Sequence, residues 1–385
     1  MKPDAVLTVG LFTTARQLQN GHAYRPGGRF VRLAKAGLKH DVFLYAFVPE
    51  WIDEARRMIR AVPLFLSDRT SPSARRPVVL SALDVVYNRL PTRDDEARAL
   101  RAIRTLERWT GGALFNPRFF DKWSVYILLK LSGATVFMPH TERCISKGDL
   151  IRWAEGAKSA PLQADDPPGL FSFYLKPLAS RLGEGIYAVR REKDALWLVD
   201  AEGQRARFAD AWALADALWP LIQSRAYLLQ RAVRRSTLSG RAVDLRALVQ
   251  KNARGRFRLS GIGARVGAPG APTTHIARGG TVRALRSALD ALFFPAETVQ
   301  IIERAKAASL AVAERLDARA GGRLGELSLD FAPAEDGALW LLEVNAKPMA
   351  FDETRIERRW RAGFFQTVRY FAARAKAHAG LRGGK

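Results

Sequence analysis

Cysteine is nearly absent from this sequence, and long apolar runs are missing. Cys144 is the single cysteine among 385 residues, which excludes a disulfide framework and a cysteine-rich metal site. The histidines show no paired ligand spacing. The apolar run YILLKLSGATVFM is interrupted by Lys130 and Ser132, so we expect no membrane span. Asp4 precedes the first strand-like run, which does not fit a secretory signal. We therefore expect a soluble, cytoplasmic protein.

Lysine is also scarce, although the chain is strongly basic. The net charge is +24, yet only 14 of the 62 basic residues are lysines. The basic residues lie in short runs along the chain, and no C2H2 pattern, RNP-type motif or zipper accompanies them. A basic balance alone is weak support for nucleic-acid binding. An anionic small substrate explains the charge at least as well, so we do not expect nucleic acid as the main partner.

The first third of the sequence alternates strand-like and helical segments. Apolar runs typical of strands occupy residues 5–12, 41–48 and 77–90, and a helical pattern covers residues 93–109. This βαβ rhythm predicts a parallel sheet with helices packed on it. A turn-rich boundary follows at residues 110–117.

The rest of the chain has a different rhythm. Antiparallel strands joined by short turns are expected in the segments FSFYLKPL and GIYAVRREKDALWLVDAEG, followed by a helix at 209–224 and a strand at 226–233. Two long strands are predicted within residues 242–267, and a long helix at 296–318. A final hairpin ends near Asn345, and a basic helix closes the chain.

The final hairpin gathers oxygen-bearing side chains. If residues 334–337 form its loop, Asp330 faces Leu341. Asp330 then lies on the same face as Glu343 and Asn345. Like-charged carboxylates this close need a cation, and oxygen ligands without histidine or cysteine favour Mg²⁺ or Mn²⁺. The alternative is an exposed edge strand capped by these side chains, and we favour the metal because the opposite face is apolar: Trp340, Leu342 and Val344.

A glycine-bearing loop follows the strand that ends at Lys176. The loop carries Ser180, Gly183 and Gly185, so its backbone N–H groups can approach phosphate oxygens while the lysine supplies a compact charge. The spacing does not match a Walker motif, and a plain hairpin is the alternative. Because the composition prefers arginine, Lys122, Lys176 and Lys347 mark positions where a point-like ammonium is favoured.

Two arginines are candidates for binding a phosphate or a carboxylate. Asp244 and Arg246 are two residues apart on one predicted strand and share a face. Arg246 can bind an anion in a bidentate manner, held in place by its acidic neighbour. The alternative is an ordinary exposed ion pair. Arg265 in GIGARVG offers the same chemistry.

A series of segments in this sequence resembles, in the same order, the nucleotide-binding motifs of ATP-grasp proteins. The segments are FNPRFFDKW, YLKPLASRLGEGI, LLQRAV, DLRALVQK, GIGARVG, GELSLDF and WLLEVNAKP. Within this superfamily, the pair of segments YNRLPTR and FNPRFFDKW and the segment LEVNAKPMAFDE resemble the YheC/YheD-type endospore coat-associated ATP-grasp proteins. The resemblance implies an α/β N-terminal domain followed by a two-subdomain α+β ATP-grasp fold. The implied domains are residues 1–112, a small lid subdomain at 113–228, and a large subdomain at 229–385 that holds the metal site and the basic C-terminal helix.

The resemblance also implies roles for single residues. Lys122 and Lys176 would contact the phosphates or the adenine side, and Gln230 would face adenine. Arg246 and Arg265 would stabilise the transferred phosphoryl group or an acyl phosphate, as catalytic residues. The implied metal ligands are Asp330, Glu343 and Asn345, and the other implied cofactor-binding residues are Ser180, Gly183, Gly185 and Lys347. The hinge LLQRAV lacks the acidic residue that often binds ribose in this family, so ribose recognition stays unassigned.

The implied chemistry is the joining of a carboxylic acid to an amine or a thiol, through an acyl phosphate and with ATP and Mg²⁺ (or Mn²⁺) as cofactors. The substrate would be a small-molecule or peptide carboxylate. The alternative is a non-catalytic, ATP-binding structural protein of the spore coat, so association with spores and a role in sporulation are further expectations.

Overall fold

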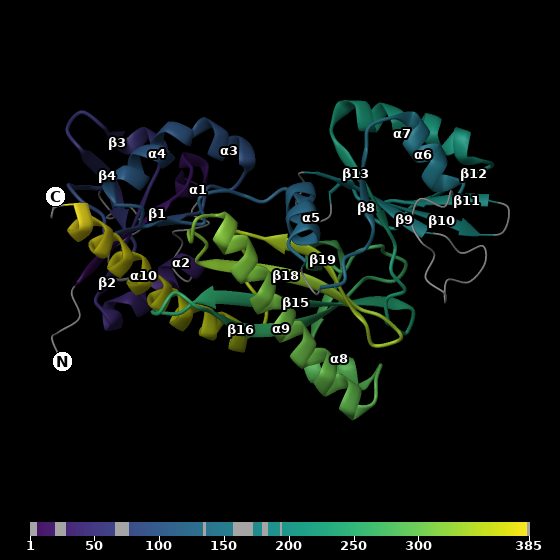
Figure 1. The fold of residues 1–385 in the computed structure, drawn as a ribbon. Coiled ribbons are helices and arrows are strands. Elements are labelled where there is room, and N and C mark those ends of the chain that lie inside the picture. Colours follow the sequence, from purple (N-terminus) through teal and green to yellow (C-terminus); the bar gives the residue numbers. More distant parts are fainter. Residues whose placement is uncertain are drawn as a thin grey trace.

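The structure is a computed structural model that describes residues 6–19, 28–65, 77–133, 136–156, 172–178, 184–192 and 195–382. Within these residues, three β-sheets follow one another along the chain, each covered by helices (Figure 1). None of the helices in these residues is both long enough and apolar enough to cross a membrane.

The first sheet has the strand order β3-β4-β2-β1-β6-β7, with β5 beside β4. Its strands are β1 (Leu7–Phe12), β2 (Val42–Phe47), β3 (Ile52–Asp53), β4 (Met58–Pro63), β5 (Val78–Leu80), β6 (Val85–Asn88) and β7 (Leu114–Phe115). The pairs β1–β2, β1–β6 and β6–β7 are parallel, which confirms the α/β prediction, whereas β4 runs antiparallel to β2. The strand predicted at 77–90 is divided into β5 and β6.

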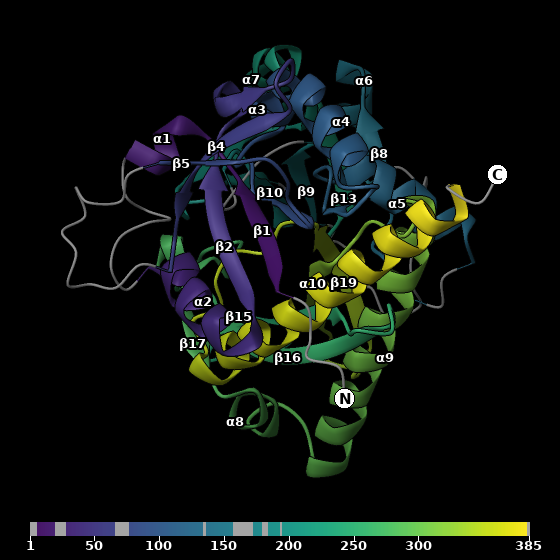
Figure 2. The same ribbon diagram turned by 90° about the vertical axis from the view of Figure 1, so that its left-hand side faces the viewer.

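Helices and short turns surround this first sheet. They are α1 (Ala15–Gln19), α2 (Arg29–Gly37), η1 (Leu38–His40), η2 (Pro49–Trp51), α3 (Arg93–Arg98) and α4 (Leu100–Trp109). The C-terminal helix α10 (Thr354–Arg382) also packs here, as Figures 1 and 2 show. Trp360, Phe364 and Phe371 of α10 share one buried cluster with Val9 and Tyr87 of the sheet. The end of the chain therefore completes the core formed by its beginning.

The second sheet is antiparallel, with the order β12-β11-β10-β9-β13-β8. Its strands are β8 (Thr141–Cys144), β9 (Ser172–Pro177), β10 (Tyr187–Glu192), β11 (Ala195–Val199), β12 (Arg205–Phe208) and β13 (Tyr227–Arg231). Helices α6 (Lys147–Ala154) and α7 (Ala211–Ser224) lie side by side over this sheet (Figure 1). Leu150, Trp153, Leu214 and Leu218 from these helices are buried against the sheet.

The third sheet has the order β17-β16-β15-β18-β19, with β14 beside β15. Its strands are β14 (Thr237–Leu238), β15 (Arg241–Lys251), β16 (Phe257–Val266), β17 (Thr281–Arg283), β18 (Glu326–Pro333) and β19 (Leu339–Asn345). The helical elements that accompany it are α5 (Lys122–Leu131), η4 (Ile276–Arg278), α8 (Leu285–Asp290) and α9 (Pro295–Arg319). The last strand of the first sheet ends at Phe115, and the last strand of the second sheet ends at Arg231. The domain boundaries predicted after residues 112 and 228 stay a prediction.

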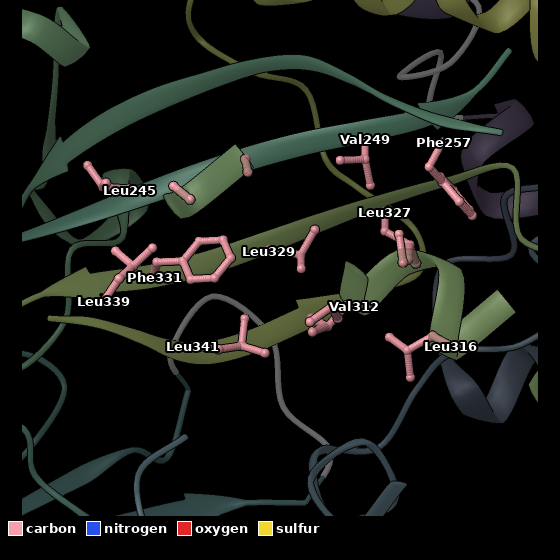
Figure 3. Packing of buried hydrophobic residues seen from close by; sticks show 14 of the residues in the cluster. Leu245, Val249, Phe257, Val312, Leu316, Leu327, Leu329, Phe331, Leu339 and Leu341 are labelled. Atoms are coloured by element: carbon pink, nitrogen blue, oxygen red, sulfur yellow. The ribbon is translucent and has the colours of Figure 1, made fainter. Parts of the chain in front are cut away.

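The third sheet has one apolar and one polar face. Leu245 and Val249 of β15 and Leu329 of β18 pack with Val312 and Leu316 of α9 (Figure 3). Successive residues of a strand point to opposite faces. The residues between these apolar positions therefore point the other way, and they include Asp244, Arg246, Ser328 and Asp330.

The hairpin β18–β19 departs from the predicted register. Asp330 lies opposite Glu343, and Phe331 lies opposite Leu341, because a bulge shifts the pairing between Asp330 and Phe331. The predicted pairing of Asp330 with Leu341 is therefore wrong. The bulge also reverses the alternation along β19, so that Leu341 is buried in the core with Val344. Asp330 and Glu343 nevertheless share a face, and the bulge places them directly opposite each other.

Candidate functional site

A cleft lies where the second and third sheets meet. Its polar part is lined from the second sheet by Lys176 and Gln230, and from the third sheet by Asp330 and Glu343. Lys122, in the first turn of α5, completes this wall. A more apolar part adjoins it and shares several lining residues with it; its own lining includes Val125, Tyr126, Met138, Leu228 and Val344. The cleft thus combines an apolar end with a charged end.

Two carboxylates occupy the third-sheet wall of the cleft. Asp330 and Glu343 are directly cross-strand, and Asn345 pairs with Ser328 one step along. Asn345 Nδ2 donates to Asp330 Oδ2 at 3.5 Å. Burial raises the pKa of Asp330, although Arg246 opposes this effect. Burial would also raise the pKa of Glu343, but Lys122 and Lys176 outweigh it and hold that pKa below its ordinary value.

These oxygen atoms suit a hard divalent cation. Within the part of the chain that the structure describes, no group of three or more His, Cys, Asp and Glu side chains is placed to hold a metal ion. The set at the cleft has two carboxylates and one amide, which is the kind of small ligand set that Mg²⁺ uses when phosphate oxygens and water complete its shell. The two facing carboxylates also repel each other, and a cation between them would remove that repulsion.

Lysines from two elements face this acidic wall. Lys122 Nζ lies 3.2 Å from Glu343 Oε1. Lys176, at the end of β9, donates to Gln230 Oε1 at 2.5 Å, and Gln230 Nε2 donates to Thr141 Oγ1 at 3.0 Å. Burial lowers the pKa of Lys176 to about 8. The direct hydrogen-bond partner of Lys176 is thus a neutral amide, while Glu343 attracts its charge without a direct hydrogen bond.

The predicted arginines lie beside the carboxylates. Arg246 Nε is 3.8 Å from Asp330 Oδ1, and its Nη2 donates to Ser328 Oγ at 3.3 Å. Arg265 lines the cleft, and its Nη2 lies 3.7 Å from Asp352 Oδ2. The Nε atoms of both arginines are buried, and among the described residues neither atom has a hydrogen-bond partner.

The sequence suggested that Asp244 holds Arg246 in place, but the structure gives Asp244 other partners. The pairing of β15 with β16 puts Asp244 opposite Arg265. Its carboxylate instead pairs with Arg235 at 3.3 Å and accepts from Thr274 Oγ1 at 2.7 Å. Arg235 also donates to Tyr174 Oη at 2.5 Å. Neither Arg235 nor Tyr174 was predicted, because each meets the cleft only through contacts with distant segments.

Three other predicted residues do not join the cleft, or cannot be placed in it. Lys347 points away: its ammonium forms an ion pair with Glu96 and donates to the Leu90 carbonyl at 3.3 Å. The structure therefore gives Lys347 a role in packing instead of the predicted cofactor contact. Ser180 and Gly183 lie outside the described residues.

Ile186 and a second segment, residues 272–275, also line the cleft. Gly185 has a φ of 67°, a conformation that favours glycine, and its neighbour Ile186 lines the cleft. His275 lines the cleft with Thr273 and Thr274. Burial lowers the pKa of His275, which keeps its ring neutral at neutral pH.

The geometry agrees with the comparison of this sequence with known proteins. A family model described as YheC/D like ATP-grasp matches residues 111–373. The chain belongs to this ATP-grasp family. The match covers both sheets of the cleft, and it confirms the predicted family and the α+β ATP-grasp fold.

Relatives of this ATP-grasp chain include a curated protein and several solved structures. The endospore coat-associated protein YheD of Bacillus subtilis (strain 168) is 29% identical over 273 residues, which are 69% of this chain and 56% of that protein. The chain thus matches only about half of the length of this curated relative.

The solved structures share the fold at low sequence identity. D-alanine-D-alanine ligase from Coxiella burnetii is 12% identical with a TM-score of 0.53, covering 97% of this chain and 98% of its own. VanG D-Ala:D-Ser ligase from Enterococcus faecalis is 11% identical with a TM-score of 0.53, covering 96% and 100%. At these identities the likeness concerns the fold, and the fold extends over almost the whole chain.

Proposed function

We propose that the protein is a Mg-ATP-dependent ligase that joins a carboxylic acid to an amine or a thiol through an acyl phosphate. The observation that carries this proposal is the pair of facing carboxylates, Asp330 and Glu343, in a cleft whose other wall bears Lys122 and Lys176. Such a wall can accept a cation, and the lysines can accept a polyphosphate. The names of the solved neighbours, both ligases, support the reaction class.

The two parts of the cleft divide the nucleotide between them. The apolar part, with Val125, Met138 and Leu228, suits the adenine ring, and Gln230 stands at its border with the polar part. Lys122 and Lys176 would hold the phosphates. Asp330, Glu343 and Asn345 would hold the metal. When bound, Mg²⁺ would offset the negative charge of the triphosphate.

The reaction proceeds in two balanced steps. A carboxylate oxygen of the acid attacks the γ-phosphorus, the bond to the β-phosphate oxygen breaks, and ADP leaves with that electron pair. The amine nitrogen then attacks the acyl carbon, the bond to the phosphate oxygen breaks, and phosphate and a proton are released. Arg246 and Arg265 would stabilise the charge of the phosphoryl group and of the acyl phosphate, because their guanidinium groups sit beside the metal-binding wall.

The test uses hydroxylamine as a general trap for acyl phosphates. The full-length protein is incubated with Mg-ATP, pooled amino acids and dicarboxylic acids, and hydroxylamine, and hydroxamates and ADP are measured. Wild type should form both, and Glu343→Gln should form neither above background. Full activity in Glu343→Gln would refute the metal role of that residue.

The competing proposal is an ATP-binding protein of the spore coat without turnover. The name of the Bacillus subtilis relative supports an association with the endospore coat and, through it, a role in sporulation. Clear Mg-ATP binding by wild type, without ADP or hydroxamate from any pooled acid, would favour this alternative over the ligase.

A further inference from the structure

Glu353 is a carboxylate with little contact with solvent, and it has no role in the reaction proposed above. It directly precedes α10, and both of its carboxylate oxygens are buried from solvent and make no hydrogen bond with any residue that the structure describes. Buried polar atoms in native proteins almost always have a partner, so a carboxylate with none is a candidate for binding a ligand. Burial raises the pKa of Glu353, although its own backbone N–H and the charge of Arg265 oppose this effect.

The fold leaves room for this carboxylate beside the arginines. Gly263 of β16 lies opposite Arg246 of β15, and a Cβ atom at Gly263 would collide with Oε1 of Glu353. Arg265 is two residues further along β16 and shares the face of Gly263. A residue with a side chain at position 263 would fill the space that Glu353 occupies. Glycine at this position therefore allows the acidic group to approach the polar face of the third sheet.

Glu353 lies near the two arginines, behind the residues that line the cleft. Arg265 lines the cleft, and the negative charges of Asp330 and Glu353 both act to raise its pKa against the effect of burial. Arg246 forms its ion pair with Asp330, and Arg265 forms its ion pair with Asp352. Among the described ion pairs, neither arginine contacts Glu353 directly. The two arginines can hold the acyl phosphate, and an acidic group next to them can hold a positively charged partner.

We propose that Glu353 binds the ammonium group of the amine substrate, which is therefore a primary amine that is cationic in solution, such as the amino group of an amino acid or a peptide. This assignment rests on the proposed ligase function. It places the anionic acyl phosphate on Arg246 and Arg265 and the protonated amine on Glu353; the ammonium then loses one proton, and the lone pair of its nitrogen attacks the acyl carbon. Opposite charges on adjacent groups thus bring the two reactants together.

The test compares a charged with an uncharged nucleophile. Hydroxylamine is mainly uncharged at neutral pH and does not need Glu353, whereas the amino acids of the pool carry ammonium groups. In Glu353→Gln, phosphate release driven by the amino acids should require about tenfold more amine or more for half-saturation, because a charge-assisted hydrogen bond is lost. Hydroxamate formation at saturating hydroxylamine should stay within about twofold of wild type.

Asp352→Asn is the matched control. Asp352 is the neighbouring carboxylate, its side chain is 52% exposed, and it also faces Arg265. Its loss should leave both reactions near the wild-type level. Equal half-saturation for amines in Glu353→Gln and wild type would overturn the assignment alone. An equal loss of both reactions in folded Glu353→Gln, checked by thermal melting, would also overturn it. No product from wild type with either nucleophile would refute the proposed function, and this assignment with it.

Discussion

Charged side chains are buried in two regions of the molecule, and their surroundings differ. The first region lies between the first sheet, the third sheet and α10. There Lys347 pairs with Glu96, and Glu326 accepts hydrogen bonds from Tyr87 and from Trp360 Nε1, the latter at 2.7 Å. Each of these charges meets a complementary group from a distant part of the chain.

The second region is the cleft between the second and third sheets. There Asp330 stands opposite Glu343, a group of the same charge, although Arg246 lies 3.8 Å from Asp330 and Lys122 lies 3.2 Å from Glu343. Lys176 contacts a neutral amide. The role of a buried charge therefore depends on the groups around it. Where a buried charge meets only complementary groups, the contact joins parts of the fold; where two carboxylates also face each other, the arrangement favours a bound cation.

The largest effect is expected for Asp330→Asn. This change removes one of two facing carboxylates, so hydroxamate formation should fall about a hundredfold or more, since the metal supplies several kcal/mol to such reactions. The melting temperature should change little, because relief of the repulsion between Asp330 and Glu343 offsets the loss of the ion pair between Asp330 and Arg246. Both quantities are measured on one preparation. A large loss of stability would show that the cleft carboxylates support the fold after all.

Lys347→Met should have the opposite profile. It leaves Glu96 buried without its partner and should lower the free energy of unfolding by about 3–5 kcal/mol. Denaturant unfolding measures the change. The double variant Lys347→Met with Glu96→Gln should recover most of the loss. Arg101→Ala, which breaks an exposed pair with Glu54, is the control and should unfold like wild type. A mild effect of Lys347→Met alone would contradict the comparison.

The smallest effect concerns the pH response of Lys176. Its pKa is lowered to about 8, while the unfolded chain keeps the ordinary value of 10.5. Between these values the unfolded state binds more protons, so stability should increase with pH through this window. Phosphates prefer the charged lysine, so affinity for Mg-ATP should fall by up to about tenfold for each pH unit above 8.

Calorimetric titration with Mg-ATP from about pH 7 to about pH 9.5 tests this response. Lys176→Arg keeps its charge across the range and should show a flat profile. An identical slope in wild type and in Lys176→Arg would exclude Lys176 as the titrating group.

Much of the fold could be predicted from local patterns. The alternation of strands and helices before residue 112 predicted the parallel core of the first sheet, and the ordered motifs predicted the ATP-grasp fold. The clustering of Lys122, Lys176, Gln230, Arg265, Asp330 and Glu343 in one cleft agrees with the predicted set, whose roles stay a prediction. Arg235, Tyr174 and Glu353 were missed, since nothing near them in the sequence marks their position in space.

The sequence by itself determined which chemical groups are present and on which stretches they alternate with apolar residues, because side-chain periodicity depends on neighbours a few positions away. Only the tertiary structure decided their partners. The bulge that sets Asp330 against Glu343, the choice of Arg235 by Asp244 and the capture of Lys347 by Glu96 each depend on how segments pack. A one-residue shift in register or one distant carboxylate is sufficient to change such a partner, and neither leaves a local signature.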